Sequence, residues 1–406
     1  MKKLFLILVI IFGFGVESYA QTQPYIILIS LDGFRWDYAN RGITPNIEYM
    51  KEHGASAISL RPDFPSKTFP NHYSIVTGMY PENHGLIANS FINPFTHEKY
   101  KNSDPNSSTD GKWYLGEALW ETAKRNGIKT ASYFWPGSEL KLDYRRPDYF
   151  EHYEQDRPYD KRIQGVIDWL QLPEKVRPHF VTLYFDTTDL AGHDFGPESQ
   201  KINNAIMYAD SALGKLFEKL HEINMFDKVN IILVSDHGMT SVSNKRVVNV
   251  EEILKNYKIT YQENGPFMLI QPEKSKVEEV YEKLKQNDNQ FRVFKRKEIP
   301  ACYHYSDNPF ISDIVLFADL GWSLVDNRSA KWMEKVDEGG NHGFDNFTLD
   351  MNGIFYAIGP AFKEGYRTGT VNNIDIYPLM CKIFDITPRS NIDGNFENIE
   401  FLLKGY

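Results

Sequence analysis

Aspartate and histidine residues stand just after three apolar segments of the chain. Asp32 follows the first segment, Asp189 and His193 follow the second, and Asp236 and His237 belong to the end of the third. Both residue types are ligands that Zn²⁺ accepts at about 2.0–2.2 Å. Functional groups collect beyond the carboxyl ends of parallel strands, so we expect these five side chains to converge on one metal site.

A further histidine, His342, lies in a glycine-rich loop (339–343), where a cofactor or substrate can approach the backbone. Each motif alone has an ordinary structural explanation. An aspartate after a strand is often a turn residue or a helix cap, and a loop histidine often only makes a hydrogen bond. Their combination at three strand ends and one loop favours metal ligation over these alternatives.

The segment 65–72 contains a candidate nucleophile, Thr68. Pro70 suits the first turn of a helix that continues to Gly78, so Thr68 is expected at or just before the helix N-terminus. The free N–H groups and the dipole of a helix favour an alkoxide and an anionic phosphate at that place. The structural alternative is that Thr68 is only an N-cap. For His72 we expect nothing more than a packed helix residue.

Four short apolar segments predict the strands that carry these groups. They lack strict alternation, which is typical of central strands covered on both faces. Amphipathic patterns between them predict helices, and such alternation indicates a mostly parallel sheet with helices on both sides. The predicted strands are 25–31, 180–185, 229–235 and 353–358, and the predicted helices are 115–125, 159–170 and 201–223.

The region from about 247 to 324 has shorter elements than the rest of the chain. Strand patterns at 267–270 and 314–317 and a helix pattern at 276–286 predict a small α+β insertion rather than a second enzyme. We therefore expect one catalytic domain, residues 21–406, with this insertion inside it.

The charge of the chain limits its partners. The formal net charge is −9, and lysine and arginine form no clustered tract. Sequence-independent binding to a nucleic-acid polymer needs a basic surface, so we do not expect such a polymer as a partner. Small phosphorylated substrates remain possible, because a metal site supplies positive charge locally.

The first 20 residues have the pattern of a signal peptide. A charged start is followed by an apolar run and by a small-x-small site that ends at Ala20, before Gln21. An uncleaved anchor is the alternative, but the run is short for a membrane span. No other segment is apolar and long enough to cross a bilayer, so we expect an exported protein, periplasmic or secreted, without a stable membrane span.

Only two cysteines occur, Cys302 and Cys381. In an exported protein they could pair, and two buried free thiols are the alternative. They are too few to form a thiolate zinc site.

Eight motifs of the chain resemble those of the nucleotide pyrophosphatase/phosphodiesterase family within the alkaline phosphatase superfamily. Their order and spacing run from about residue 24 to the C-terminus, which makes the resemblance highly specific. One departure is Phe344, where tyrosine is usual in the family. The motifs are LDGFR (31–35), KTFPNHY (67–73), TGMYP (77–81), HGLIAN (84–89), FWPGS (134–138), DLAGH (189–193), SDHGM (235–239) and GNHGFDN (340–346).

The resemblance implies an α/β fold, an alkaline phosphatase-like three-layer sandwich, and two Zn²⁺ ions. One ion would be held by Asp189, His193 and His342, and the other by Asp32, Thr68, Asp236 and His237. Asn89 would bind a non-bridging phosphate oxygen together with the backbone N–H of Phe69. Phe69, Tyr153 and Tyr184 fall where family members line the slot for a nucleobase or another leaving group.

The expected activity is hydrolysis of phosphodiester or pyrophosphate bonds of nucleotides and related esters through a phospho-threonine intermediate. A diester is expected as substrate rather than a monoester, because little positive charge other than the ions would face the phosphate. The same aromatic walls could hold a choline head group, so a choline-phospholipid or glycerophosphocholine phosphodiesterase is the nearest alternative. A catalytically inactive exported binding protein is a second alternative, but every proposed site position holds a competent residue. Sequence alone leaves the oligomeric state open.

Overall fold

The computed structural model describes residues 23–406. The predicted signal peptide and its cleavage site lie outside the described residues. Among residues 23–406, no helix combines the length and the apolar character needed to cross a membrane.

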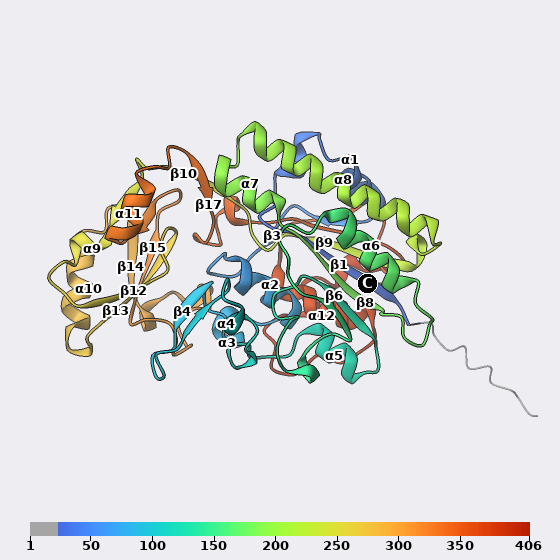
Figure 1. The fold of residues 1–406 in the computed structure, drawn as a ribbon, viewed down its shortest axis with the longest axis horizontal. Coiled ribbons are helices and arrows are strands. Elements are labelled where there is room, and N and C mark those ends of the chain that lie inside the picture. The colour runs from blue at the N-terminus through green and yellow to red at the C-terminus, as the bar shows by residue number, and fades with distance from the viewer. Residues whose placement is uncertain (1–22) are drawn as a thin grey trace, which may run out of the picture.

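An eight-stranded sheet runs through the centre of the larger part of the molecule (Figure 1). Only β18 is antiparallel to its neighbours in this sheet, which confirms the prediction of a mostly parallel sheet. In spatial order the strands are β19 (Tyr366–Thr368), β2 (Ala55–Ala57), β18 (Phe355–Ile358), β9 (Val229–Val234), β1 (Tyr25–Leu31), β8 (Phe180–Phe185), β6 (Thr130–Tyr133) and β7 (Tyr149–Glu151).

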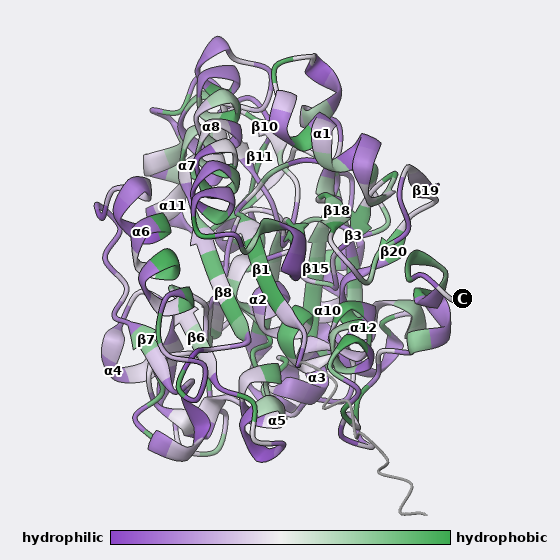
Figure 2. Ribbon diagram, turned by 90° about the vertical axis from the view of Figure 1, so that its right-hand side faces the viewer, coloured by the Kyte–Doolittle hydropathy of each residue, from purple (hydrophilic) through white to green (hydrophobic). Residues whose placement is uncertain are grey.

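The central strands are apolar along their whole length because both faces of the sheet are covered. In β1, Ile26 and Leu28 belong to the hydrophobic core on one face, while Ile27 and Ile29 belong to the core on the other. The strands accordingly form a hydrophobic band between the more polar outer helices (Figure 2). This arrangement explains why the strands lack the alternation of a sheet with one face in water.

Helices pack on each face. One core includes side chains of α1 (Pro45–His53), α6 (Tyr159–Leu170) and α8 (Gln200–Glu222). The other includes side chains of α2 (Thr68–Thr77), α5 (Leu119–Arg125) and α12 (Ile376–Ile383). The predicted helices 159–170 and 201–223 are thus confirmed almost to the residue.

The predicted helix 115–125 is wrong at its start. Gly116 has a left-handed φ of +80° and Ala118 is extended, so α5 begins only at Leu119. An apolar pattern does not reveal such a turn, because the backbone conformation at Gly116, rather than hydrophobicity, determines where the helix begins.

A second, smaller sheet lies beside the large one, at the left of Figure 1. Its four antiparallel strands and α10 share a hydrophobic core of their own, which the short predicted elements of this region anticipate in part. In spatial order the strands are β12 (Ile259–Gln262), β13 (Phe267–Pro272), β15 (Ile314–Ala318) and β14 (Phe291–Lys295), and the helix is α10 (Val277–Lys285).

Further short elements complete the described part of the fold. They include the hairpin β4–β5 (Ser90–Ile92 and Lys99–Lys101), the pair β10–β17 (Thr240–Val242 and Gly339–Asn341), the pair β11–β16 (Val247–Asn249 and Ser323–Val325), α7 (Thr187–Phe195), α9 (Val250–Ile253) and α11 (Asn327–Met333).

The two cysteines differ from both expectations for them. Both thiols are free, and only Cys381 is buried, while Cys302 is exposed.

Candidate active site

Three adjacent strands bring the predicted metal ligands to one edge of the sheet. In the register of β9, β1 and β8, Ser30 lies opposite Val234 on one side and Tyr184 on the other, so the three strands end side by side. Asp32 directly follows β1, Asp236 lies two residues beyond β9, and Asp189 lies in the helix that follows β8. The carboxyl ends of neighbouring parallel strands therefore position these groups, as expected.

The histidine nitrogens and carboxylate oxygens form two overlapping groups whose ligand atoms lie within 4.8 Å of one another. Asp32, Asp236 and His237 form the first group, and Asp189, His237 and His342 form the second. Nε2 of His237 lies 3.4 Å from Oδ1 of Asp32 and 3.0 Å from Oδ2 of Asp236. Oδ1 of Asp189 lies 3.7 Å from Nε2 of His342.

Two further predicted residues join these groups. Nε2 of His193 lies 3.4 Å from Oδ1 of Asp189, and Oγ1 of Thr68 lies 3.2 Å from Nε2 of His237. The structure thus brings together all seven side chains that the sequence predicts as metal ligands.

The three histidines present the same ring nitrogen to the site. Nδ1 of His193 lies 3.0 Å from the carbonyl oxygen of Gly340, and Nδ1 of His237 lies 2.8 Å from that of Gly238. Nδ1 of His342 lies 2.8 Å from the carbonyl oxygen of Ser66. A carbonyl oxygen only accepts, so each Nδ1 carries a hydrogen and Nε2 is the ring atom that faces the site, where it binds a metal when it carries no proton.

Three carboxylate oxygens in the site have no hydrogen-bond partner among the described residues. They are Oδ1 of Asp32, Oδ1 of Asp189 and Oδ2 of Asp236. Buried polar atoms without partners are costly, and here they also face the Nε2 atoms of histidines. A divalent cation between them would satisfy both kinds of atom, so the residues present fit a bound metal.

The pKa values of the site residues also fit a bound metal. Burial raises the pKa of Asp32, and the neighbouring charges of Asp236 and Asp189 raise it further. Burial also acts to raise the pKa of Asp236, but the adjacent imidazoles of His237 and His72 hold it well below its ordinary value. Burial, followed by the charge of His237, lowers the pKa of His342 well below its ordinary value and keeps it neutral, the form that binds metals.

Thr68 is the first residue of α2 and not its N-cap. The N-cap position is held by Lys67, whose side chain makes no capping hydrogen bond, and Gly78 ends the helix with a φ of +66°. The Thr68 hydroxyl is therefore not used for capping and points to His237 instead. This placement puts the hydroxyl at the positive end of the helix dipole.

Asn89 lies beside the same helix terminus. Its Oδ1 accepts a hydrogen bond of 3.1 Å from the backbone N–H of Phe69. The resemblance implies that the backbone N–H of Phe69 binds a phosphate oxygen. In this structure that N–H donates to Asn89 instead. The bond fixes the orientation of the amide, which leaves the Nδ2 donor of Asn89 for a ligand.

The predicted aromatic residues lie in different surroundings. Tyr184 is 8% exposed and its hydroxyl donates a 2.5 Å hydrogen bond to Oδ2 of Asp32. Tyr153 is 50% exposed, and its ring meets that of Tyr184 at 6.3 Å between centroids. Phe69 packs against the hydrophobic core that includes α2. Tyr184 therefore holds a metal-type ligand, a contact that the sequence did not predict.

His72 is a second contact that sequence reasoning missed. It is buried, as expected of a packed residue, but its Nδ1 lies 2.9 Å from the carbonyl oxygen of Thr68 and 3.2 Å from Oδ2 of Asp236. Its Nε2 lies 2.8 Å from Oγ of Ser30. The available signal was its spacing: residues four apart lie on the same face of a helix, so His72 had to lie beneath Thr68.

The fold and the site define an α/β protein of the alkaline phosphatase-like type. Residues 26–345 match the family described as type I phosphodiesterase / nucleotide pyrophosphatase. The chain belongs to this family.

Relatives in animals and fungi match nearly the whole chain. Human ectonucleotide pyrophosphatase/phosphodiesterase family member 1 is 36% identical over 94% of this chain, and the uncharacterized pyrophosphatase/phosphodiesterase C725.05c of Schizosaccharomyces pombe is 35% identical over 92%. The chain spans 42% of the length of the human protein and 79% of the fungal one.

Solved structures are similar over the same range. Murine ectonucleotide pyrophosphatase/phosphodiesterase 5, in an inactive form in complex with AMP, superimposes with a TM-score of 0.88 at 32% identity. The match covers 94% of this chain and 100% of that one. Human ectonucleotide pyrophosphatase/phosphodiesterase 5 gives the same TM-score at 33% identity, with the same coverage of both chains.

Proposed function

We propose that this chain is an exported two-zinc hydrolase that cleaves phosphodiester or pyrophosphate bonds of nucleotides, with Thr68 as the nucleophile. The observation that carries the proposal is the set of three unpartnered carboxylate oxygens beside the Thr68 hydroxyl, facing the Nε2 atoms of three histidines. Family membership supports the reaction class, and the AMP bound to the murine relative supports a nucleotide as substrate.

The side chains divide into two sets that would each hold one Zn²⁺ ion. Asp189, His193 and His342 form one set, and Asp32, Thr68, Asp236 and His237 form the other. Bound zinc would supply the positive charge that lowers the proton affinity of a hydroxyl and stabilises negative charge on the reacting oxygens.

Residues of the chain position the nucleophile. Oγ1 of Thr68 attacks phosphorus, so that a Thr68–phosphorus bond forms as the bond to the leaving oxygen breaks; water then cleaves the phospho-threonine. His72 contacts both the Thr68 carbonyl and Asp236, and it thereby fixes the nucleophile relative to a metal ligand. The Nδ2 of Asn89 is available as a donor to a non-bridging oxygen, where negative charge grows in the transition state.

The charge balance of the site favours a diester. Lys67 is the lysine next to the nucleophile, but it is buried, and burial lowers the pKa of its ammonium group. A diester brings one negative charge and a monoester brings up to two. Little positive charge from the side chains next to the nucleophile is therefore available to offset the second negative charge of a monoester.

The partly exposed ring of Tyr153 beside Tyr184 gives a nucleobase an aromatic surface on which to stack. The same surface suits a choline head group through cation–π contact, which keeps a choline phosphodiesterase as the second candidate.

Turnover of three nitrophenyl substrates by the purified, metal-analysed protein tests the proposal. They are the ester of thymidine 5′-monophosphate, free nitrophenyl phosphate, and nitrophenyl phosphocholine. We expect about two metal equivalents per chain and the highest kcat/KM for the nucleotide ester. A preference for the phosphocholine ester would move the assignment to the second candidate. Full activity after metal removal would overturn both.

A further inference from the structure

Asn89, the proposed donor to the phosphate, lies at the end of the loop between α3 (Pro81–His84) and β4. Loops are more mobile than the helices and strands that they join, and a donor stabilises a transition state only where it is held in place beforehand. The hydrogen bond between Oδ1 and the backbone of Phe69 orients the side chain of Asn89. The backbone that carries this side chain must be held by the neighbouring residues.

Two side chains from the region of the smaller sheet hold the backbone on either side of Asn89. Oε1 of Glu263 accepts a 2.7 Å hydrogen bond from the backbone N–H of Ser90, the residue after Asn89. The hydroxyl of Tyr305 donates a 2.8 Å hydrogen bond to the backbone carbonyl of Ile87, two residues before Asn89. Glu263 directly follows β12, and Tyr305 lies between β14 and β15. One part of the fold therefore fixes the chain both before and after the donor.

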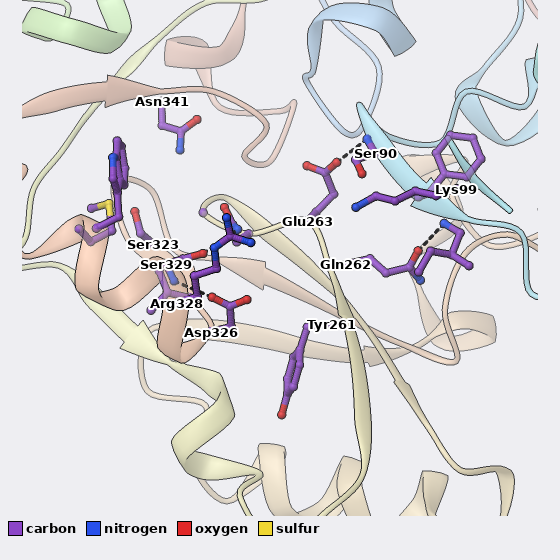
Figure 3. Close-up of a pocket in the computed structure, with 17 residues that line it drawn as sticks. Ser90, Lys99, Tyr261, Gln262, Glu263, Ser323, Asp326, Arg328, Ser329 and Asn341 are labelled. Carbon is purple, nitrogen blue, oxygen red and sulfur yellow. Dashed lines mark hydrogen bonds between the residues drawn. The ribbon is translucent and has the colours of Figure 1, made fainter. Parts of the chain in front are cut away.

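Other hydrogen bonds attach the same segment of chain to the region of the smaller sheet. Oε1 of Gln262 accepts a 2.6 Å hydrogen bond from the backbone N–H of Ile92. Figure 3 shows the side chains of Gln262 and Glu263 directed from the end of β12 toward β4, with both hydrogen bonds drawn as dashed lines. Oε2 of Glu82 accepts a 2.6 Å hydrogen bond from the backbone N–H of Ser306. The segment is thus attached along its length and not only beside the donor.

The backbone of Glu263 indicates that its carboxylate has a specific role. Its φ is +57°, in the left-handed region, where glycine and asparagine are common and other residues are rare. The side chain is partly buried, and burial raises the pKa of its carboxyl group. A strained backbone and a partly buried carboxylate both cost stability, and such costs are typical of functional positions. The turn itself does not require a glutamate, so the contact with Ser90 accounts for the residue.

We propose that Glu263 and Tyr305 are positioning residues, which hold the Nδ2 donor of Asn89 against the phosphate of the substrate. They act through the backbone on either side of Asn89 and not by contact with the substrate. Without them the backbone shifts, and Nδ2 moves away from the oxygen on which negative charge grows in the transition state. The inference rests on the proposed function, because it concerns the same reaction.

The test measures kcat and KM on the nitrophenyl ester of thymidine 5′-monophosphate for Glu263→Gly, Glu263→Gln and Tyr305→Phe. Glycine suits a left-handed backbone, so Glu263→Gly removes the carboxylate without straining the turn. Glu263→Gly and Tyr305→Phe should each lower kcat by about tenfold, less than the roughly 10²–10³ expected for loss of the donor itself. KM should stay nearly constant, because the donor acts mainly in the transition state.

Glu263→Gln tests whether the hydrogen bond is what matters. Glutamine keeps an acceptor for the N–H of Ser90, so this variant should recover most of the kcat that Glu263→Gly loses. Melting temperatures show whether each variant is folded. If Glu263→Gly does not fold, Tyr305→Phe, which removes only a hydroxyl, decides by the same measurements.

Coupling to Asn89 distinguishes positioning from a general structural role. In an Asn89→Ala background no donor is left to position. Glu263→Gly and Tyr305→Phe should then change kcat by less than about twofold, although each costs about tenfold in the wild-type background. Residues that only stabilise the fold would cost the same factor in both backgrounds.

Glu251→Gly and Tyr257→Phe are the matched controls. Oε2 of Glu251 accepts a 2.9 Å hydrogen bond from the backbone N–H of Asn327, and the hydroxyl of Tyr257 donates a 3.0 Å hydrogen bond to Oε1 of Glu279. Each control therefore loses a comparable bond that does not involve the segment around Asn89. Both should leave kcat unchanged.

Three results would overturn the positioning role and leave the proposed function intact. The first is a kcat within about twofold of the wild-type value in both Glu263→Gly and Tyr305→Phe. The second is an undiminished loss in the Asn89→Ala background. The third is a Glu263→Gln variant as impaired as Glu263→Gly, since the charge of Glu263 on Lys67 would then matter rather than the hydrogen bond. If the wild-type protein does not cleave the ester, the proposed function itself fails and the positioning role with it.

Discussion

Replacing Asn89 by alanine and by aspartate separates two roles of its side-chain amide. Oδ1 accepts the hydrogen bond of 3.1 Å from the backbone of Phe69, and Nδ2 remains for the substrate. Alanine removes both functions. Aspartate keeps an acceptor for Phe69 but puts a negative charge where the donor was.

The expected losses differ between the two variants. Removing one preorganised donor to developing negative charge costs roughly 10²–10³ in rate, so Asn89→Ala should lose about that factor in kcat/KM. In Asn89→Asp the new carboxylate faces the phosphate. Two like charges about 4 Å apart repel by about 4 kcal/mol at an effective dielectric constant of about 20, which is about 10³-fold. Asn89→Asp should therefore be at least as impaired as Asn89→Ala.

The assay is kcat/KM on a single nucleotide diester, with bound metal and melting temperature measured for each variant. If Asn89 only holds the helix terminus, aspartate should restore what alanine loses. Near-wild-type turnover in Asn89→Asp, with a deficit in Asn89→Ala, would refute a direct contact between Asn89 and the substrate.

Three other predictions follow from buried groups. Removal of metal by a chelator should lower the melting temperature, because the buried carboxylate oxygens and the nearby ring nitrogens then lose the cation that binds them. An unchanged melting temperature would contradict metal binding at this site. Tyr184→Phe removes the hydrogen bond to Asp32 and should weaken metal affinity by about 10- to 100-fold in a competition titration, and equal affinities would argue against this role. Burial raises the pKa of Asp63 to about 8, so its carboxyl group stays protonated in the folded protein at a pH where the unfolded chain, with a pKa of about 4, has lost the proton. The free energy of unfolding should therefore fall as the pH rises from about 4 to about 8. Asp63→Asn should flatten the dependence of the melting temperature on pH from 5 to 8, and an unaltered slope would show that Asp63 is not the group responsible.

The strands and long helices were predictable because the spacing of their apolar residues indicates which faces are buried. The segment 25–31 is apolar on both faces, and β1 has those bounds because both faces are covered. The spacing of apolar residues in 201–223 likewise gives α8 to within a residue at each end. Helix α5 was misplaced at its start because backbone conformation at Gly116, rather than hydrophobicity, decides where it begins.

The candidate ligands were predictable as a set, because the ends of parallel strands must meet at one edge of the sheet. The hydrogen bonds that hold these ligands in place were not predictable. Whether Tyr184 points its hydroxyl to Asp32 depends on the strand register and on the side-chain rotamer, and neither is visible in a sequence. The hydrogen bond from Ser90 to Glu263 joins residues 173 positions apart and exists only because the smaller sheet folds back toward the site.

The central claim is that Thr68 is the attacking group, and its most direct test is kcat/KM of Thr68→Ala on one nucleotide diester, with bound metal counted in the same sample. If Thr68 attacks phosphorus, the variant should stay folded and bind metal but lose nearly all turnover, while Thr68→Ser, which keeps the hydroxyl, should retain part of it. Substantial activity in a metal-replete Thr68→Ala would contradict a phospho-threonine intermediate and with it the mechanism proposed for this site.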